Sequence, residues 1–102
     1  MDYKVIWSPR GIASLREQIQ YIARHNPIAS RRMGEVILSK ALLLGQFPHM
    51  GKVFAKLGRE DVRELSIRPY RLFHHVQDAR RTVTIITVWH GARQDPDDLA
   101  QE

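Results

Sequence analysis

Two residues in the second half of the chain, Arg71 and His90, have side chains suited to chemistry on phosphate esters. Arg71 lies in a predicted strand, and a guanidinium stays charged and binds phosphate with two donors. His90 ends the last predicted strand, and an imidazole titrates near neutrality, so it could serve as an acid or a base. The structural alternative for Arg71 is an ion pair with Glu64 on the neighbouring strand.

Further basic residues lie in loops. Lys52, Lys56 and Arg59 form a basic loop that is suited to phosphate contacts, and Arg93 follows the last strand, free to reach a phosphate or an acidic partner. An ordinary solvated loop is the alternative for all four. His74 and His75 are neighbours in a predicted strand, so they point to opposite faces and cannot act as a pair. We expect one of them to be buried.

Composition limits the class of protein. The 102 residues suffice for one domain, which we place at residues 1–102, and 43% of them are hydrophobic. The absence of cysteine excludes disulfides and thiolate metal sites. No apolar run approaches a membrane span and no signal peptide is visible, so we expect a cytoplasmic protein without a membrane partner. The formal net charge of +5 favours nucleic acid, the ribosome or an acidic protein as partner.

Helix-capping residues, prolines and the spacing of apolar residues predict the elements that position these side chains. Tyr3 to Trp7 is typical of a strand, and Ser8-Pro9 and Asn26-Pro27 each predict a helix start. The first helix has an apolar stripe, and the second runs to about Gly45. We assign two sets to these stripes: Ile12, Leu15, Ile19 and Ile22 in the first helix, and Ala29, Met33, Val36, Ile37 and Leu44, flanked by Leu43 and Phe47, in the second.

The C-terminal half is predicted to be sheet. Alternation in Val62 to Ile67 places Arg63, Leu65 and Ile67 on one face. Thr82 to Trp89 is apolar on both faces, which is typical of a central strand. We assign Val83, Ile85 and Trp89 to one face of it and Ile86 and Val88 to the other. A short strand at Val53-Phe54 is also expected, and the tail after Arg93 is acidic and expected to fray. The fold class is therefore α+β, in the order β-α-α-β-β-β, with a helical hairpin on one face of a mainly antiparallel sheet.

Six short segments in this order resemble the RelE/ParE toxin superfamily of type II toxin–antitoxin systems. They are Val5-Ile6-Trp7-Ser8-Pro9, the helix pair broken at Asn26-Pro27, Phe47-Pro48-His49-Met50-Gly51, Val62-Arg63-Glu64-Leu65, Pro69-Tyr70-Arg71-Leu72 and Val88-Trp89-His90-Gly91-Ala92-Arg93. The resemblance implies a growth-inhibiting toxin that is neutralised by a cognate antitoxin. RelE-like members cleave mRNA on the ribosome without a metal or cofactor, whereas ParE-like members inhibit DNA gyrase; the shared fold does not choose between them.

Some sequence features favour the RelE-like mechanism, and others favour the ParE-like mechanism. A RelE-like nuclease would use Arg71 on the phosphate, with His90 as acid or base, and the Tyr70-Arg71-Leu72 segment is similar to such nucleases. ParE-like proteins also carry a strand-terminal histidine, where it fixes the chain end. No tyrosine follows Tyr70, which favours the ParE-like mechanism slightly. A non-toxic nucleic-acid-binding or degenerate member is a third reading.

The resemblance also implies a hetero-oligomer with an antitoxin. Tyr21, Ile28 and Leu42 lie off the main helical stripes, and together they could form an exposed apolar patch for the antitoxin. The alternative is that they complete the core. Because the chain is basic, we expect the antitoxin's C-terminal segment to be acidic.

Overall fold

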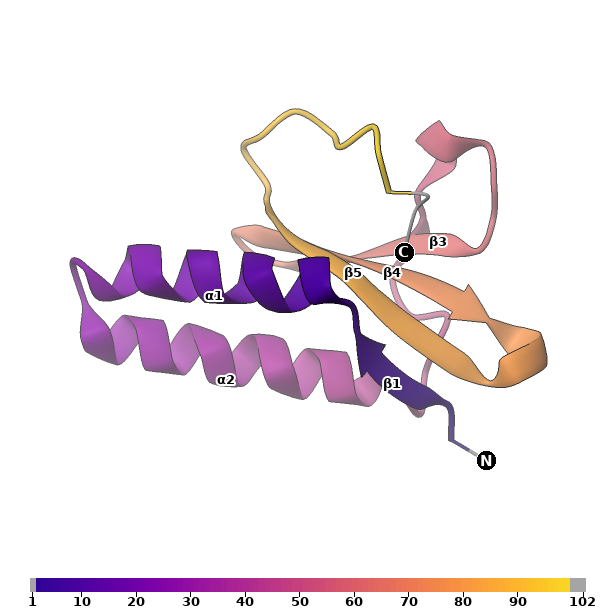
Figure 1. The fold of residues 1–102 in the computed structure, drawn as a ribbon, viewed down its shortest axis with the longest axis horizontal. Helices are drawn as coiled ribbons and strands as arrows, with labels where there is room; N and C mark the ends of the chain where they lie inside the picture. The colour runs from indigo at the N-terminus through magenta and orange to yellow at the C-terminus, as the bar shows by residue number, and fades with distance from the viewer. Residues whose placement is uncertain (1, 100–102) are drawn as a thin grey trace.

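The computed structural model describes residues 2–99 and has the predicted element order. Two helices lie together on one face of a five-stranded sheet (Figure 1). Short 3₁₀ turns occur at Ala55–Leu57 and Asp78–Arg80. The elements are β1 (Lys4–Trp7), α1 (Pro9–Ala23), α2 (Pro27–Leu43), β2 (Lys52–Val53), β3 (Val62–Ile67), β4 (Tyr70–Gln77) and β5 (Thr82–His90). The predicted short strand thus begins and ends one residue earlier than expected. Among the described residues, no helix is long and apolar enough to cross a membrane.

Both helices begin where the sequence predicts. The Ser8 side chain accepts the Gly11 N–H at 2.9 Å, and the Asn26 side chain accepts the Ala29 N–H at 3.0 Å. Each cap is followed by proline at the first helical position, whose fixed φ suits a helix start. The second helix ends at Leu43, slightly before Gly45.

The strand order in the sheet is β1-β5-β4-β3-β2. β1 is parallel to β5, and the other pairs are antiparallel. The last strand therefore lies inside the sheet, between β1 and β4, as its apolar character on both faces predicts. The edges are formed by β1 and by the two-residue strand β2.

A β-bulge in β5 corrects the predicted faces of that strand. Phe73 pairs with Thr87 and His74 pairs with Ile85, which leaves Ile86 as an extra residue. The bulge shifts the alternation by one position, so a strictly alternating assignment fails. Val83, Ile85 and Val88 lie in the core under the helices, whereas Ile86 and Trp89 lie in a second cluster. The predicted face of Trp89 was thus wrong, and so was the predicted face of Val88.

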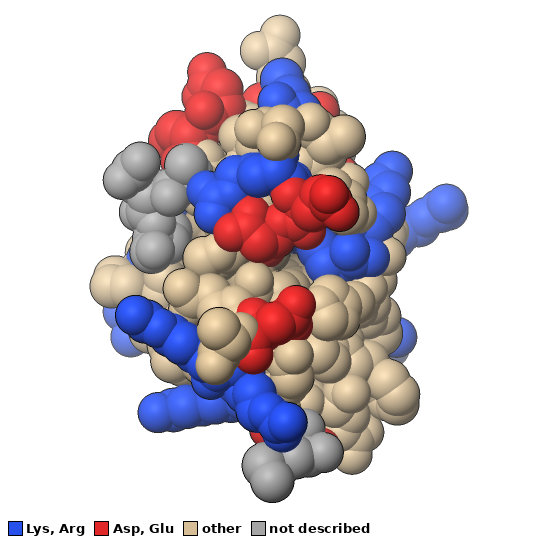
Figure 2. Space-filling model, turned by 90° about the vertical axis from the view of Figure 1, so that its right-hand side faces the viewer, with Lys and Arg blue, Asp and Glu red and all other residues tan. Residues whose placement is uncertain are grey.

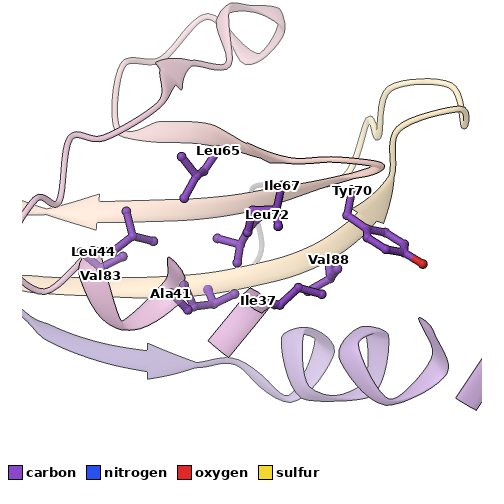
Figure 3. Packing of buried hydrophobic residues seen from close by; sticks show 10 residues of the cluster. Ile37, Ala41, Leu44, Leu65, Ile67, Tyr70, Leu72, Val83 and Val88 are labelled. Atoms are coloured by element: carbon purple, nitrogen blue, oxygen red, sulfur yellow. The ribbon is translucent and has the colours of Figure 1, made fainter. Parts of the chain in front are cut away.

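The main core lies between the helices and the sheet (Figure 3). From α2, Ile37 and Ala41 point to the sheet, followed by Leu44 just beyond the helix; their i, i+4, i+7 spacing forms one stripe. They meet Leu65, Ile67, Tyr70, Leu72, Val83, Ile85 and Val88 of the sheet.

Several residues assigned to the helical stripes are exposed. Ile12, Val36, Leu43 and Phe47 are 40–58% accessible. Val36 and Leu43 each precede a buried residue by one position, which rotates them by about 100° from the buried stripe of the helix. The sheet covers only one face of α2, so the second apolar face stays exposed.

Candidate functional site

Arg71 lies on the sheet face that the helices do not cover, and two carboxylates hold its guanidinium. Its Nη1 donates to Glu64 Oε1 at 3.2 Å, and its Nη2 donates to Asp95 Oδ1 at 2.8 Å. The guanidinium carbon lies 5.1 Å from the centre of the Phe73 ring. Only 20% of the Arg71 side chain is exposed. The Glu64 ion pair expected as the structural alternative is therefore present, and a second pair with Asp95 accompanies it.

His90 lies on the opposite face of the sheet from Arg71. It pairs across the strands with Tyr70, whereas Arg71 pairs with Trp89, and successive residues of a strand point to opposite faces. The His90 ring packs edge-on against the Tyr70 ring at 5.4 Å, and its Nδ1 accepts the Ala92 N–H at 3.1 Å. The structure thus separates the two residues on which a nuclease mechanism would depend, and it gives His90 a hydrogen bond at the chain end.

The chain after β5 folds back over the face that carries Arg71. We call residues Gly91–Leu99 the C-terminal strap. Besides the Asp95 contact, Arg10 donates to the Asp98 carboxylate at 3.1 Å and to its carbonyl oxygen at 3.0 Å. Leu99 is only 1% exposed and belongs to the second apolar cluster. The expectation that this tail frays is therefore wrong up to Leu99, because its acidic and apolar side chains find partners on the sheet.

Arg93 and Trp89 join the strap to the sheet. The guanidinium carbon of Arg93 lies 3.8 Å from the centre of the Trp89 ring, and Trp89 Nε1 donates to the Gln94 carbonyl at 3.0 Å. Sequence reasoning missed Arg10, Asp95 and Asp98. The sequence feature that could have indicated these contacts is the acidic segment Asp95 to Leu99, which ends in leucine, in a chain of positive net charge.

The predicted basic loop does not form one group of free cations. Arg59 Nε and Nη2 both donate to the Asp61 carboxylate, and His75 Nε2 lies 2.8 Å from Asp61 Oδ2. The Arg59 guanidinium, followed by the His75 contact, holds the pKa of Asp61 well below its usual range. Acidic and basic side chains are interspersed on the end of the molecule shown in Figure 2. Arg59 is therefore engaged, while Lys56 is exposed in the 3₁₀ turn.

Lys52 contributes to a separate hollow beside Arg71. It pairs with Glu64 across β2 and β3, and the hollow has a volume of about 480 Å³. Its lining residues are Gly51, Lys52, Glu64, Leu65, Ser66 and Arg71. A carboxylate and two cations thus meet in one concave surface, and this group contains two of the candidate residues.

The two neighbouring histidines lie on opposite faces of β4, as predicted. His74 is fully buried, and neither ring nitrogen has a hydrogen-bond partner among the described residues. Burial lowers the pKa of His74 to about 4, so the ring is neutral at pH 7. His75 faces Asp61 on the other side.

The candidate antitoxin-binding residues are exposed but do not form one patch. Tyr21, Ile28 and Leu42 are 60%, 69% and 74% accessible. Ile28 and Leu42 are at opposite ends of α2, about 20 Å apart along the helix. Leu42 instead lines an apolar hollow of about 630 Å³ beside β1, which includes Val5 and Leu43.

That hollow continues along α2 toward Val36, because Leu43 also lines the next one. We call this surface the α2 groove; it comprises Val5, Val36, Leu42 and Leu43. The sequence signal for it was the pair of consecutive apolar runs, Val36 to Leu38 and Ala41 to Leu44. A helix with such runs is apolar on more faces than one sheet can cover.

The structure is thus a small basic α+β domain with an apolar groove along α2 and a charged hollow beside Arg71. The family model described as "ParE toxin of type II toxin-antitoxin system, parDE" matches residues 5–95. Toxin RelE2 of Caulobacter vibrioides is 31% identical over 91 residues, which cover 88% of this chain and 97% of that protein. The chain therefore belongs to the RelE/ParE superfamily of type II toxin–antitoxin toxins.

Solved structures support the same fold. The chromosomal ParDE system of P. aeruginosa matches with a TM-score of 0.71 at 15% identity, covering 86% of this chain and 95% of that one. The toxin–antitoxin complex RelBE2 of Mycobacterium tuberculosis matches with a TM-score of 0.65 at 22% identity, covering 88% and 99%. Likeness at these identities shows the architecture, and ParDE and RelBE systems share it.

Proposed function

We propose that this toxin arrests growth by binding a protein target, DNA gyrase, and that it does not cleave RNA. The observation that carries the proposal is the separation of Arg71 and His90 on opposite sheet faces, with the Arg71 guanidinium held by Glu64 and Asp95. General acid–base cleavage needs the phosphate-binding cation and the proton donor around one phosphate. The match to the ParE toxin model supports the same choice.

A cognate antitoxin is the partner that we propose for the α2 groove. An amphipathic segment can bury apolar anchors in such a groove, and β1 offers an open strand edge next to it. Arg32, Lys40 and Glu35 line the groove near Val36, and this excess of positive charge suits an acidic antitoxin segment. The relatives named as toxin–antitoxin complexes support a partner of this kind. We further propose that residues 1–102 form one toxin domain, which acts in the cytoplasm as part of a hetero-oligomer.

Ribosome-dependent mRNA cleavage is the second candidate, and the hollow beside Arg71 favours it. There Glu64 could take a proton from a 2′-hydroxyl while Arg71 and Lys52 bind the phosphate. For this to happen, the Asp95 carboxylate must leave Arg71, since it occupies one of the two outer nitrogens.

Inducing the protein alone in growing cells separates these candidates. We expect growth to stop, with filamentation and DNA-damage signalling, while mRNA remains intact. Arg71→Ala should retain the arrest, and so should Arg68→Ala, a matched control at an exposed arginine outside the hollow. Substitution of an apolar residue in the groove, Leu42→Glu, should leave the toxin active but insensitive to its antitoxin.

Two results would contradict the proposal. Codon-phased mRNA breaks that disappear in Arg71→Ala would show cleavage through Arg71. Unimpaired growth on induction of the native chain would point to a non-toxic or degenerate member of the family.

A further inference from the structure

The C-terminal strap lies over the second face of the sheet as a bound peptide would. Asp95 pairs with Arg71, Asp98 pairs with Arg10, and Arg93 stacks on Trp89. Leu99 lies in the apolar cluster, and Pro96 is also buried. Within the described residues the strap adds no strand to the sheet. Its attachment therefore depends on side-chain contacts at separate points, which can be released without breaking the sheet.

A hollow lies beneath the strap. Its volume is about 570 Å³, and it is lined by Arg10 of α1, Trp89 of β5 and the strap from Arg93 to Asp98. In Figure 1 the strap, drawn in yellow, arches away from the end of β5 before it returns. The Asp95 and Asp98 side chains are 44% and 69% exposed, and ion pairs so open to water bind weakly. The buried Leu99 and Pro96 are thus the main anchors of the strap.

The surface under the strap combines arginines with aromatic rings. Arg10 and Arg71 lie beside Trp89, on which Arg93 of the strap stacks, and Phe73 and Ile86 belong to the same apolar cluster as Trp89. Guanidinium groups bind carboxylates with paired donors, and tryptophan with arginine is the composition of strong protein-binding surfaces.

We propose that this surface binds an acidic, extended segment of a protein partner, and that the strap is its internal competitor. The strap itself defines the chemistry that fits: two carboxylates three residues apart, followed directly by a leucine, as in Asp95, Asp98 and Leu99. Arg71 and Trp89 of the site lie on the sheet face opposite the helices, and Arg10 comes from the first turn of α1. The site requires neither the gyrase target nor the α2 groove. Because an attached segment competes at high effective concentration, an external segment binds well only when the strap is weakened.

The proposal is tested with the full chain and a labelled, end-capped peptide of the sequence Gln-Asp-Pro-Asp-Asp-Leu. Asp95→Asn/Asp98→Asn removes the two strap carboxylates that pair with Arg71 and Arg10, and it leaves the surface beneath intact. It should bind the peptide roughly fivefold or more tightly than the native chain. Asp97→Asn is the control, since Asp97 makes no side-chain hydrogen bond or ion pair among residues 2–99. Adding Arg71→Gln to the double variant should abolish the gain.

Hydrogen exchange of the unmodified protein gives a second measurement. The Trp89 indole N–H donates to Gln94 of the strap, so it should exchange well before the amides of β5. Equal peptide binding by the native, control and double-variant chains would overturn the proposal, and so would an indole that exchanges only on global unfolding. Binding of single-stranded RNA, but not of the peptide, by the double variant would also overturn it and assign the surface to nucleic acid.

Discussion

The two faces of the sheet differ in what covers them. Under α1 and α2, aliphatic side chains such as Leu72 and Ile37 are fully buried, and the cover is helical and continuous. On the other face, aromatic residues and arginines lie beneath the strap, which is held at separate points, and beside Phe54 and Leu57 of the segment that follows β2. The first face is therefore suited to stabilising the fold, and the second is suited to exchanging one ligand for another.

The two faces differ in their contribution to the free energy of unfolding as well as in composition. Burying aliphatic side chains in a closed core gives stability that is lost only when the domain unfolds. Contacts made by exposed carboxylates and one leucine can be lost locally. A substitution on the helix-covered face should therefore change global stability, whereas one on the strap should change the accessibility of the face beneath.

The largest effect should come from the helix-covered face. Leu72→Ala removes a fully buried side chain from the centre of the core, and we expect the free energy of unfolding to fall by about 4 kcal/mol. Leu42→Ala, at a side chain 74% exposed, is the matched control and should change it by less than about 0.5 kcal/mol. Urea unfolding followed by circular dichroism measures both. A small effect at Leu72 would remove the distinction between the faces.

Acid should weaken the fold through His74. Its pKa is 6.5 ordinarily and about 4 when buried, so the neutral ring stabilises the fold fully above pH 6.5. That contribution, about 3 kcal/mol, is lost as the pH falls from 6.5 toward 4. Unfolding measured at pH 7 and pH 4.5 should show this loss in the native chain. His74→Leu should reduce it, whereas substitution of the exposed His25 should leave it unchanged.

Close packing of α1 on β5 depends on Gly11. A Cβ atom there would lie 2.7 Å from the Ile85 carbonyl oxygen, so Gly11→Ala should destabilise the fold by about 2 kcal/mol. Gly34 offers the comparison, since its nearest neighbour would be an Ile19 methyl group at 3.4 Å. Gly34→Ala should leave stability unchanged or raise it by up to about 1 kcal/mol, because alanine favours the helix. Thermal unfolding of the two variants provides the check, and equal losses would contradict the packing argument.

The smallest change in global stability should come from the strap. Leu99→Ala removes one of the two buried side chains of the strap, but the strap can detach while the sheet stays folded, so we expect a loss of about 1 kcal/mol or less. Trp89 should become more accessible to a fluorescence quencher in this variant, with Trp7→Phe as the common background. A loss as large as that of Leu72→Ala would mean that the strap belongs to the core.

Local signals in the sequence predicted the architecture well. Ser8-Pro9 and Asn26-Pro27 set the helix starts because capping and proline geometry act within a few residues. Alternation in β3 gave the correct faces for Leu65 and Ile67. The faces of β5 could not be read, since it is apolar on both sides and nothing in its sequence marks the bulge at Ile86.

The candidate site was only partly predictable. Sequence reasoning identified Arg71 and its pairing with Glu64, because both residues lie in neighbouring strands of a predictable meander. Asp95 and Arg10 were missed, because each meets its partner only after the strap has folded back onto the rest of the chain. The separation of Arg71 from His90 likewise follows from the strand register, which fixes the face of each residue at the end of β5.

A supercoiling assay with purified DNA gyrase tests the proposed binding function most directly. We expect the purified toxin to inhibit supercoiling in proportion to its concentration, Arg71→Ala to inhibit comparably, and mRNA on programmed ribosomes to stay intact. Undiminished supercoiling together with cleavage of ribosome-bound mRNA by the native chain, but not by Arg71→Ala, would contradict it.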